Sequence, residues 1–272
     1  MSHASVRHEG LRPSQRGRIR GALVDGWILA KRSLIHTRRS PDLLVFATIQ
    51  PVIFVLLFRY VFGGAIDVGD GSYVNFLMPG IFVQTVAFGA VLTGIGLAED
   101  LQKGIVDRFR SLPMARSAVL TGRTVADLAR NAFIVLVMLL VGLLVGFRPE
   151  AGLWDWAGAV GLMLLFGYAF SWISATIALL LGGVEAVQSF GFIWLFPLTF
   201  ASSAFVPTDG MPDWLEAFAN NQPVTLVVDT VRALLLDRPL GSEGWQALAW
   251  CLGILLVFVP LSVSLYGRVA KR

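Results

Sequence analysis

The charged residues best placed to act together lie between residues 104 and 123, in the stretch GIVDRFRSLPMARSAVLTGR. One carboxylate and four guanidinium groups within twenty residues can form salt bridges with a complementary protein surface. The stretch holds no histidine or cysteine, so it offers neither a nucleophile paired with a base nor a set of metal ligands. The chemistry that this pattern predicts is recognition of a partner.

The rest of the chain is poor in catalytic patterns. The three histidines, His3, His8 and His36, are scattered near the N-terminus, and the single cysteine, Cys251, has no second cysteine for a disulfide. The phosphate-binding pattern G-x-x-x-x-G-K-[ST] is absent. We therefore expect no catalytic residue, no metal and no cofactor bound by this chain, and any energy for work should come from another chain.

The composition is that of an integral membrane protein. Of 272 residues, 56% are hydrophobic and 15% are charged, whereas about a quarter are charged in a soluble domain. The mean hydropathy is +0.70. A helix needs about 20 apolar residues to cross the hydrocarbon core. Because strand-like alternation is absent, we expect an all-α polytopic fold with six transmembrane helices, over residues 43–62, 76–98, 124–147, 154–181, 187–206 and 245–267.

The distribution of positive charge predicts the orientation of these spans. Eighteen of the 22 Lys and Arg residues fall in the N-terminal tail, in residues 99–130 or at the C-terminus. The positive-inside rule then places both termini in the cytoplasm of a multi-pass protein of a bacterial plasma membrane. We expect a basic cytosolic tail over residues 1–20, an interfacial helix over 21–41 and a membrane domain over 42–269. Since topology explains the charge, no nucleic-acid partner is expected.

Residues 104–123 cannot cross the membrane. Burying Asp107, Arg108, Arg110 and two further arginines would cost roughly 12 to 17 kcal/mol at about 3 kcal/mol each. Residues 100–112 can instead form a short cytosolic helix with an apolar stripe, which Pro113 would end. An ordinary basic loop that fixes the topology is one interpretation, and a helix that docks on a partner is the other.

A second segment, residues 207–244, is too polar to cross the membrane and too apolar for a plain linker. Residues 212–219 begin with Pro212 and carry Asp213 and Glu216 in the first turn, which favours a short helix. Residues 223–236 have an apolar face but are too short to span. We expect two short re-entrant helices on the outer side before the last span, or alternatively a helical hairpin lying on the membrane surface.

Several motifs in a fixed order resemble a known family. These are Gly104, 108–113 (RFRSLP), Arg116, 122–123 (GR), Asp127, Arg130, 185–188 (EAVQ), 204–207 (AFVP), 211–215 (MPDWL), 221–225 (NQPVT), Asp229 and 232–234 (RAL). Over residues 42–269 the chain resembles the type-2 ABC exporter permeases, especially their daunorubicin-resistance (DrrB-like) branch.

The resemblance implies a half-permease that pairs with a second permease copy, identical or not, and sits on two cytosolic ATPase subunits. ATP and magnesium would be bound by those subunits. The helix over 21–41 would be the connecting helix of the family, and the helix over 100–112 its coupling helix. The residues implied for ATPase coupling are Leu101, Ile105, Asp107, Arg108, Phe109, Arg110, Leu112 and Glu185. The turn that contains Glu185 can also be read as a tight turn only.

The resemblance also implies a substrate path between the second and fifth spans and an outer gate. The residues expected on the path are Gln84, Thr85, Phe88, Phe192, Phe196 and Thr199, and those expected at the gate are Phe205, Pro207, Trp214 and Pro223. Aromatic rings with isolated amides and hydroxyls suit a hydrophobic or amphipathic molecule, such as a drug, an antibiotic or a lipid-like metabolite. Export of a polysaccharide or lipid-linked glycan is an alternative, and a non-transporting membrane scaffold or sensor is another.

Overall fold

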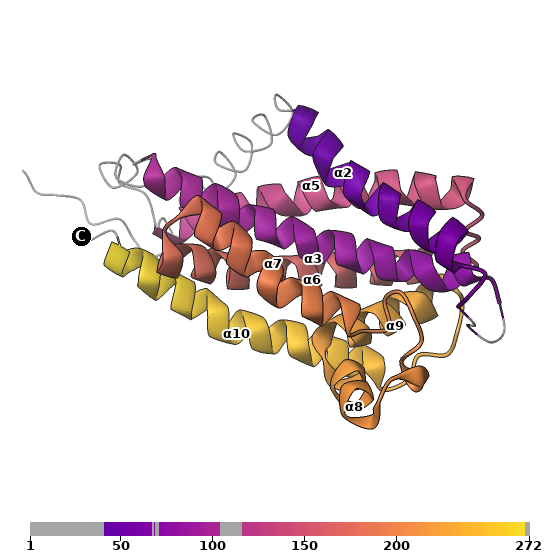
Figure 1. Cartoon of the computed structure of the whole chain (residues 1–272). Coiled ribbons are helices and arrows are strands. Elements are labelled where there is room, and N and C mark those ends of the chain that lie inside the picture. The colour runs from indigo at the N-terminus through magenta and orange to yellow at the C-terminus, as the bar shows by residue number, and fades with distance from the viewer. Residues whose placement is uncertain (1–40, 67, 69–70, 104–115, 270–272) are drawn as a thin grey trace, which may run out of the picture.

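The computed structural model describes residues 41–66, 68, 71–103 and 116–269. These residues form helices and no strand, as predicted. In Figure 1 the long helices run side by side, and two short helices, α8 and α9, lie at the end of the bundle remote from the C-terminal end of α10. The helices, in chain order, are α2 (Pro41–Leu56), the π-helix η1 (Leu57–Phe62), α3 (Tyr73–Gln102), α5 (Arg116–Leu144), α6 (Leu153–Leu181), α7 (Val184–Phe200), the 3-10 turn η2 (Thr208–Gly210), α8 (Asp213–Asn221), α9 (Pro223–Leu235) and α10 (Glu243–Val269).

Three of these helices, α3, α6 and α10, are long and apolar enough to cross a membrane. Three shorter apolar helices cover Thr48–Phe62, Arg130–Leu144 and Val184–Phe200. Within the described residues, each of the six predicted spans therefore overlaps an apolar helix. The number of spans stays a prediction.

Helix α3 is the centre of the bundle and α10 lies on its outside. In the most apolar window of each helix, 78% of the α3 residues are buried against 11% of the α10 residues. Glycines let α6 and α7 approach α3 closely, because a Cβ on Gly167 would lie 2.4 Å from Val86 and one on Gly191 would lie 2.6 Å from Val91. Small residues serve this purpose in membrane helices, where hydrophobicity alone does not drive association.

Local signals explain several helix ends. At the start of α9 the Gln222 side chain accepts a hydrogen bond from the Val224 amide at 2.9 Å, and Pro223 occupies the first helical position. At the end of α6, Gly182 takes the left-handed conformation at φ 69° and donates its amide hydrogen to Ala178 O. This is the usual glycine stop of a helix.

Some predicted bounds differ from the structure. Residues 100–102, expected to begin a separate coupling helix, form the last turn of α3. Helix α5 begins at Arg116, eight residues before the predicted start at 124, and α7 ends at Phe200, six residues before the predicted end at 206. The predicted connecting helix, 21–41, and residues 104–115 lie outside the described residues, except for Pro41, which begins α2.

Candidate substrate cavity and outer network

A largely apolar cavity of about 220 Å³ opens between four helices. Helix α3 supplies most of its wall, α2 and α7 face it, and α5 contributes one residue. The lining residues are Gln50, Pro51, Phe54, Gln84, Thr85, Phe88, Gly89, Val91, Leu92, Ile95, Ile134, Gln188 and Phe192.

Four of the six residues predicted for the substrate path line this cavity: Gln84, Thr85, Phe88 and Phe192. The other two do not. Thr199 is fully buried, and its hydroxyl donates to Leu195 O at 2.8 Å. Phe196 is 38% exposed, and its ring packs edge-on against Phe88 with centroids 5.3 Å apart.

The sequence analysis did not predict that the first apolar run, which forms α2, lines the cavity. Gln50, Pro51 and Phe54 come from α2, and Gln188 comes from the first part of α7. A signal was present, because Gln50 and Gln188 are carboxamides inside otherwise apolar stretches. In such a stretch, a polar side chain that faces a cavity avoids contact with hydrocarbon.

The polar groups of the cavity are neutral and few. Three glutamines and the hydroxyl of Thr85 are its polar side chains, and no charged side chain lines it among the described residues. The Thr85 hydroxyl is occupied by Ile81 O at 2.6 Å. Gln84 is only 2% exposed and lines the cavity. Its carboxamide can donate and accept hydrogen bonds there, so it can bind a polar group of a ligand or a water molecule.

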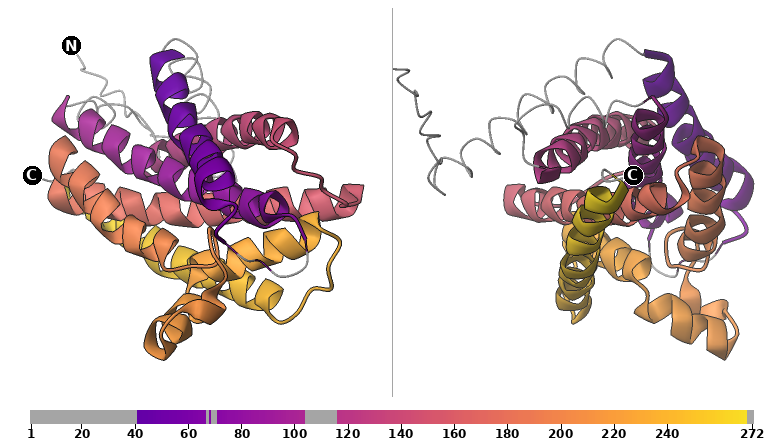
Figure 2. Two further views of the ribbon diagram at one scale, coloured as in Figure 1. Left: turned by 45° about the vertical axis from the view of Figure 1, so that its right-hand side comes forward. Right: turned by 90° about the vertical axis from the view of Figure 1, so that its left-hand side faces the viewer.

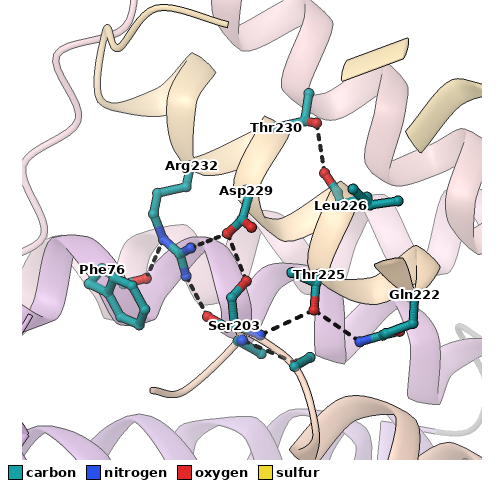
Figure 3. Close-up of polar contacts among 10 residues, drawn as sticks. Phe76, Ser203, Gln222, Thr225, Leu226, Asp229, Thr230 and Arg232 are labelled. Carbon is teal, nitrogen blue, oxygen red and sulfur yellow. Dashed lines mark hydrogen bonds and ion pairs between the residues drawn. The ribbon is translucent and has the colours of Figure 1, made fainter. Parts of the chain in front are cut away.

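At the end of the bundle that carries α8 and α9 (Figures 1 and 2), Arg232 holds three segments together (Figure 3). The side chain starts on α9, is nine-tenths buried, and donates to Phe76 O of α3 at 3.1 Å and to Ser203 O at 2.7 Å. It also pairs with Asp229, whose carboxylate accepts a hydrogen bond from the Ser203 hydroxyl at 2.7 Å. The Phe76 ring lies under the guanidinium at 3.8 Å, which is a cation–π contact.

The buried setting changes the acid–base properties of this pair. Burial lowers the pKa of Arg232 to about 10, which leaves the guanidinium charged at neutral pH. Burial also raises the pKa of Asp229, while the charge of Arg232 opposes that change. The Asp229 side chain remains 34% exposed, so water shares in its solvation. Both members of the pair also bond Ser203, and these bonds join α9 to the loop 201–206.

The same loop carries Phe205, one of the predicted gate residues. Phe205 is 2% exposed, and its carbonyl accepts a hydrogen bond from the Tyr73 hydroxyl at 2.9 Å. Helix α3 passes so close to the loop that a Cβ on Gly80 would lie 2.0 Å from Ala204 O. The loop is thus held from both sides, by α3 and by α9.

The three other predicted gate residues are spread over residues 207–223. Pro223 is buried at the start of α9, Pro207 is half-buried, and Trp214 is 74% exposed on α8. Trp214 therefore presents its indole to the surroundings, while Phe205 and Pro223 lie inside the molecule. Whether any of the four gates a path stays a prediction.

Only two of the predicted coupling residues are described. Leu101 is half-buried in the last turn of α3, and Glu185 is exposed in the first turn of α7, directly after the turn at 182–183. The remaining six, Ile105, Asp107, Arg108, Phe109, Arg110 and Leu112, lie outside the described residues.

Arg130 lies deeper than the charge distribution alone suggested. Its guanidinium donates to Gly89 O at 3.0 Å, and Gly89 lies near the middle of α3. The sequence analysis counted Arg130 among the positive residues expected on the cytosolic side. The structure instead places the Arg130 guanidinium against Gly89, one of the residues that line the cavity.

The comparison with protein families decides what kind of protein has this architecture. Residues 25–236 match the family model described as "ABC-2 type transporter", so the match covers most of the chain. The chain belongs to the ABC-2 type transporter family. The matched region includes every helix that lines the cavity, as well as α8 and α9.

Individual ABC-2 relatives agree with this assignment. The chain is 33% identical over 266 residues to a daunorubicin resistance ABC transporter permease protein, DrrB1, of Streptomyces coeruleorubidus, covering 96% of this chain and 91% of the relative. It is 27% identical over 249 residues to the probable doxorubicin resistance permease DrrC of Mycobacterium tuberculosis, covering 89% and 87%. A putative transport permease, ycf38, of Cyanophora paradoxa is 27% identical over 214 residues, covering 76% and 73%. The predicted family is therefore confirmed.

Proposed function

We propose that this ABC-2 type chain is the permease subunit of an ATP-driven exporter of hydrophobic or amphipathic compounds, such as drugs, antibiotics or lipid-like metabolites. The observation that carries the proposal is the cavity between α2, α3, α5 and α7, because its lining combines apolar rings with neutral amides. Such a surface favours an uncharged or amphipathic organic group over a polyanion or a heavily hydroxylated glycan. Two relatives are named as daunorubicin or doxorubicin resistance permeases, which supports the same substrate class.

The proposed topology has six spans with both termini in the cytoplasm of a bacterial plasma membrane. The charge distribution supports this orientation, and α8 and α9 then lie on the outer side. In agreement with it, the exposed Trp214 and Trp245 lie on α8 and at the start of α10, where an outer interfacial belt of aromatic residues would form.

The proposed energy source is a pair of cytosolic ATPase subunits that bind ATP and magnesium. A second permease copy would complete the transporter. Residues 100–112, with the apolar side chains of Leu101, Ile105, Phe109 and Leu112, would dock on an ATPase, and Glu185 would form a second contact. The apolar stripe supports a docking role, because a loop that only fixes topology needs no apolar face.

Coupling can be tested by placing a charge in the apolar stripe. Phe109→Glu and Leu112→Glu should each weaken co-purification of the ATPase at least tenfold, since a buried carboxylate without a partner is strongly unfavourable at an interface. The residual complex should lose the stimulation of ATP hydrolysis by doxorubicin in lipid. Co-purified ATPase is measured by gel densitometry, and turnover by phosphate release.

The matched control is Leu144→Glu, because Leu144 is 87% exposed at the opposite end of α5. It should leave association with the ATPase unchanged. Unaltered association and turnover in correctly inserted Phe109→Glu and Leu112→Glu variants would refute the coupling proposal. Stable association without any doxorubicin-stimulated hydrolysis in the wild type would instead favour the scaffold interpretation.

A further inference from the structure

Eight phenylalanines form one continuous set of ring contacts, called here the phenylalanine ladder. They come from α2 and η1, from α3, from α7 and from the loop 201–206. Neighbouring ring centroids lie 4.6 to 6.1 Å apart, the range in which aromatic pairs attract each other. The members are Phe54, Phe58, Phe62, Phe88, Phe192, Phe196, Phe200 and Phe205.

The ladder begins in the cavity and ends at the outer network. Phe54, Phe88 and Phe192 line the cavity. Phe196 and Phe200 continue along α7, and the buried Phe205 contacts Phe54, Phe58 and Phe200 at 5.8, 4.6 and 5.1 Å. Phe205 lies in the loop that Arg232 and Tyr73 hold in place. The rings therefore connect the cavity to the end of the bundle that carries α8 and α9.

The ladder is not a general property of the apolar surface. The exposed residues in the middle of α10 are aliphatic, for example Leu252, Leu256 and Val257, and those of α5 are mainly leucines such as Leu136 and Leu140. Exposed rings such as Trp250 on α10 and Phe133 on α5 also occur there, but no ring contact joins them to the ladder within the described residues. Phe196 and Phe200 stack on each other and remain about 40% exposed, so part of each ring can still contact a further aromatic group.

We propose that the phenylalanine ladder is a stacking surface for planar polycyclic aromatic substrates, which it guides from the cavity toward the outer end. A planar ring system can overlap two neighbouring rungs at once, so it can pass from one pair to the next without losing all contact. Gln84 lies one helical turn from Phe88 in the cavity wall, and its carboxamide can bond a carbonyl or hydroxyl of the same molecule. This inference rests on the proposed function and narrows its substrate class.

The test compares binding of two probes to the full chain in detergent micelles. Doxorubicin has a planar, fluorescent ring system, and tetrabutylammonium is an aliphatic cation without rings. In the variant Phe196→Leu/Phe200→Leu the side chains stay apolar but the rings are lost. We expect the dissociation constant for doxorubicin to rise about 5- to 100-fold, from two lost ring contacts. Tetrabutylammonium binding should change less than about twofold.

The matched control is Phe133→Leu, because Phe133 is an exposed phenylalanine on α5 outside the ladder. It should alter the binding of neither probe. The proposal is overturned if the wild type does not bind doxorubicin, if the double variant binds it normally, or if both probes are weakened alike. It is also overturned if the double variant loses self-association in cross-linking, because the ladder face would then be an interface between copies.

Measuring doxorubicin binding and ATP-driven doxorubicin transport separately distinguishes failure of the stacking proposal from failure of the exporter proposal. If doxorubicin binding depends on the ladder but the complete transporter does not move doxorubicin with ATP, the stacking proposal is supported and the exporter proposal is refuted. If ATP-driven doxorubicin transport is unchanged by loss of the rings, the exporter proposal is supported and the stacking proposal is refuted.

Discussion

At the scale of single residues, Arg232 is the side chain on which the outer end most depends. Replacing it by methionine keeps the volume but removes the donors to Phe76 O and Ser203 O and leaves Asp229 without its counter-charge. Breaking a buried ion pair costs about 3–5 kcal/mol, and the partial exposure of Asp229 lowers this to about 2–4 kcal/mol. The midpoint of thermal unfolding in detergent, followed by tryptophan fluorescence, should fall accordingly.

Two variants sharpen the Arg232 prediction. Arg232→Lys keeps the charge but cannot reach three acceptors with one ammonium group, so an intermediate loss is expected. Arg238→Met removes an exposed arginine from the same region and should change the midpoint little. Equal effects of Arg232→Met and Arg238→Met would contradict the assigned role.

Gly80 supports a second prediction at this scale. A Cβ there would lie 2.0 Å from Ala204 O and 2.8 Å from Ala204 Cα, both backbone atoms that cannot turn aside. Gly80→Ala should therefore destabilise the protein by about 1–3 kcal/mol, as overpacking does. Gly161→Ala is the matched control, because a Cβ at Gly161 meets nothing within 4 Å. It should be neutral or stabilising by up to about 1 kcal/mol, and the same change in midpoint for both would refute the argument.

At the scale of helices, α6 and α10 are joined by a buried hydroxyl pair. Thr176 Oγ1 and Ser262 Oγ lie 2.7 Å apart, and the Thr176 hydroxyl also reaches Trp172 O. Ser262→Ala should cost about 0.6 kcal/mol, the average for hydrogen bonds between membrane helices. Ser264→Ala, on the exposed side of the same helix, should cost less. A larger effect at Ser264 would show that the pair does not join the helices.

The helix boundaries show what sequence periodicity can and cannot predict. Apolar length placed all six long helices, and Pro223 placed the start of α9 within one residue. The end of α7 was missed because residues 201–206 are as apolar as the helix before them. Two local bonds and one long-range bond accompany the end of the helix: Ser202 Oγ bonds Thr199 O and the Ala204 amide, and Gln222 Nε2 bonds Leu198 O, 24 residues away. No local pattern encodes contacts made across twenty residues.

Cavity residues on α3 could be predicted from the sequence. The contribution of α2 to the same cavity could not. The family resemblance pointed to the second and fifth spans, and the spacing of Gln84, Thr85 and Phe88 agrees with it because they share one face of α3. The contribution of α2 depends on how that helix crosses α3 and α7, which composition does not determine. Likewise, Arg232 and Asp229 were named as motif positions but not as a pair, although their spacing of three residues on one helix was the local signal of an ion pair.

At the scale of the whole molecule, the bundle combines a buried central helix, an uncharged cavity and a braced outer end. Helix α3 contributes to all three, because it lines the cavity, passes the loop 201–206 at Gly80 and binds Arg232 through Phe76 O. A tilt of α3 relative to α9 would therefore change the cavity and the outer loop together. This shared helix is the physical basis on which we expect ATPase movements to reach the outer end.

The most direct test of the exporter account is ATP-driven movement of doxorubicin in liposomes that contain this chain and its co-purified ATPase. With the ATPase outside, the account predicts accumulation of doxorubicin inside the vesicles that requires ATP hydrolysis. It also predicts that Gln84→Leu, which leaves an apolar cavity without this amide, reduces the initial rate several-fold at a low doxorubicin concentration. Equal doxorubicin uptake with ATP and with a non-hydrolysable analogue would contradict the account.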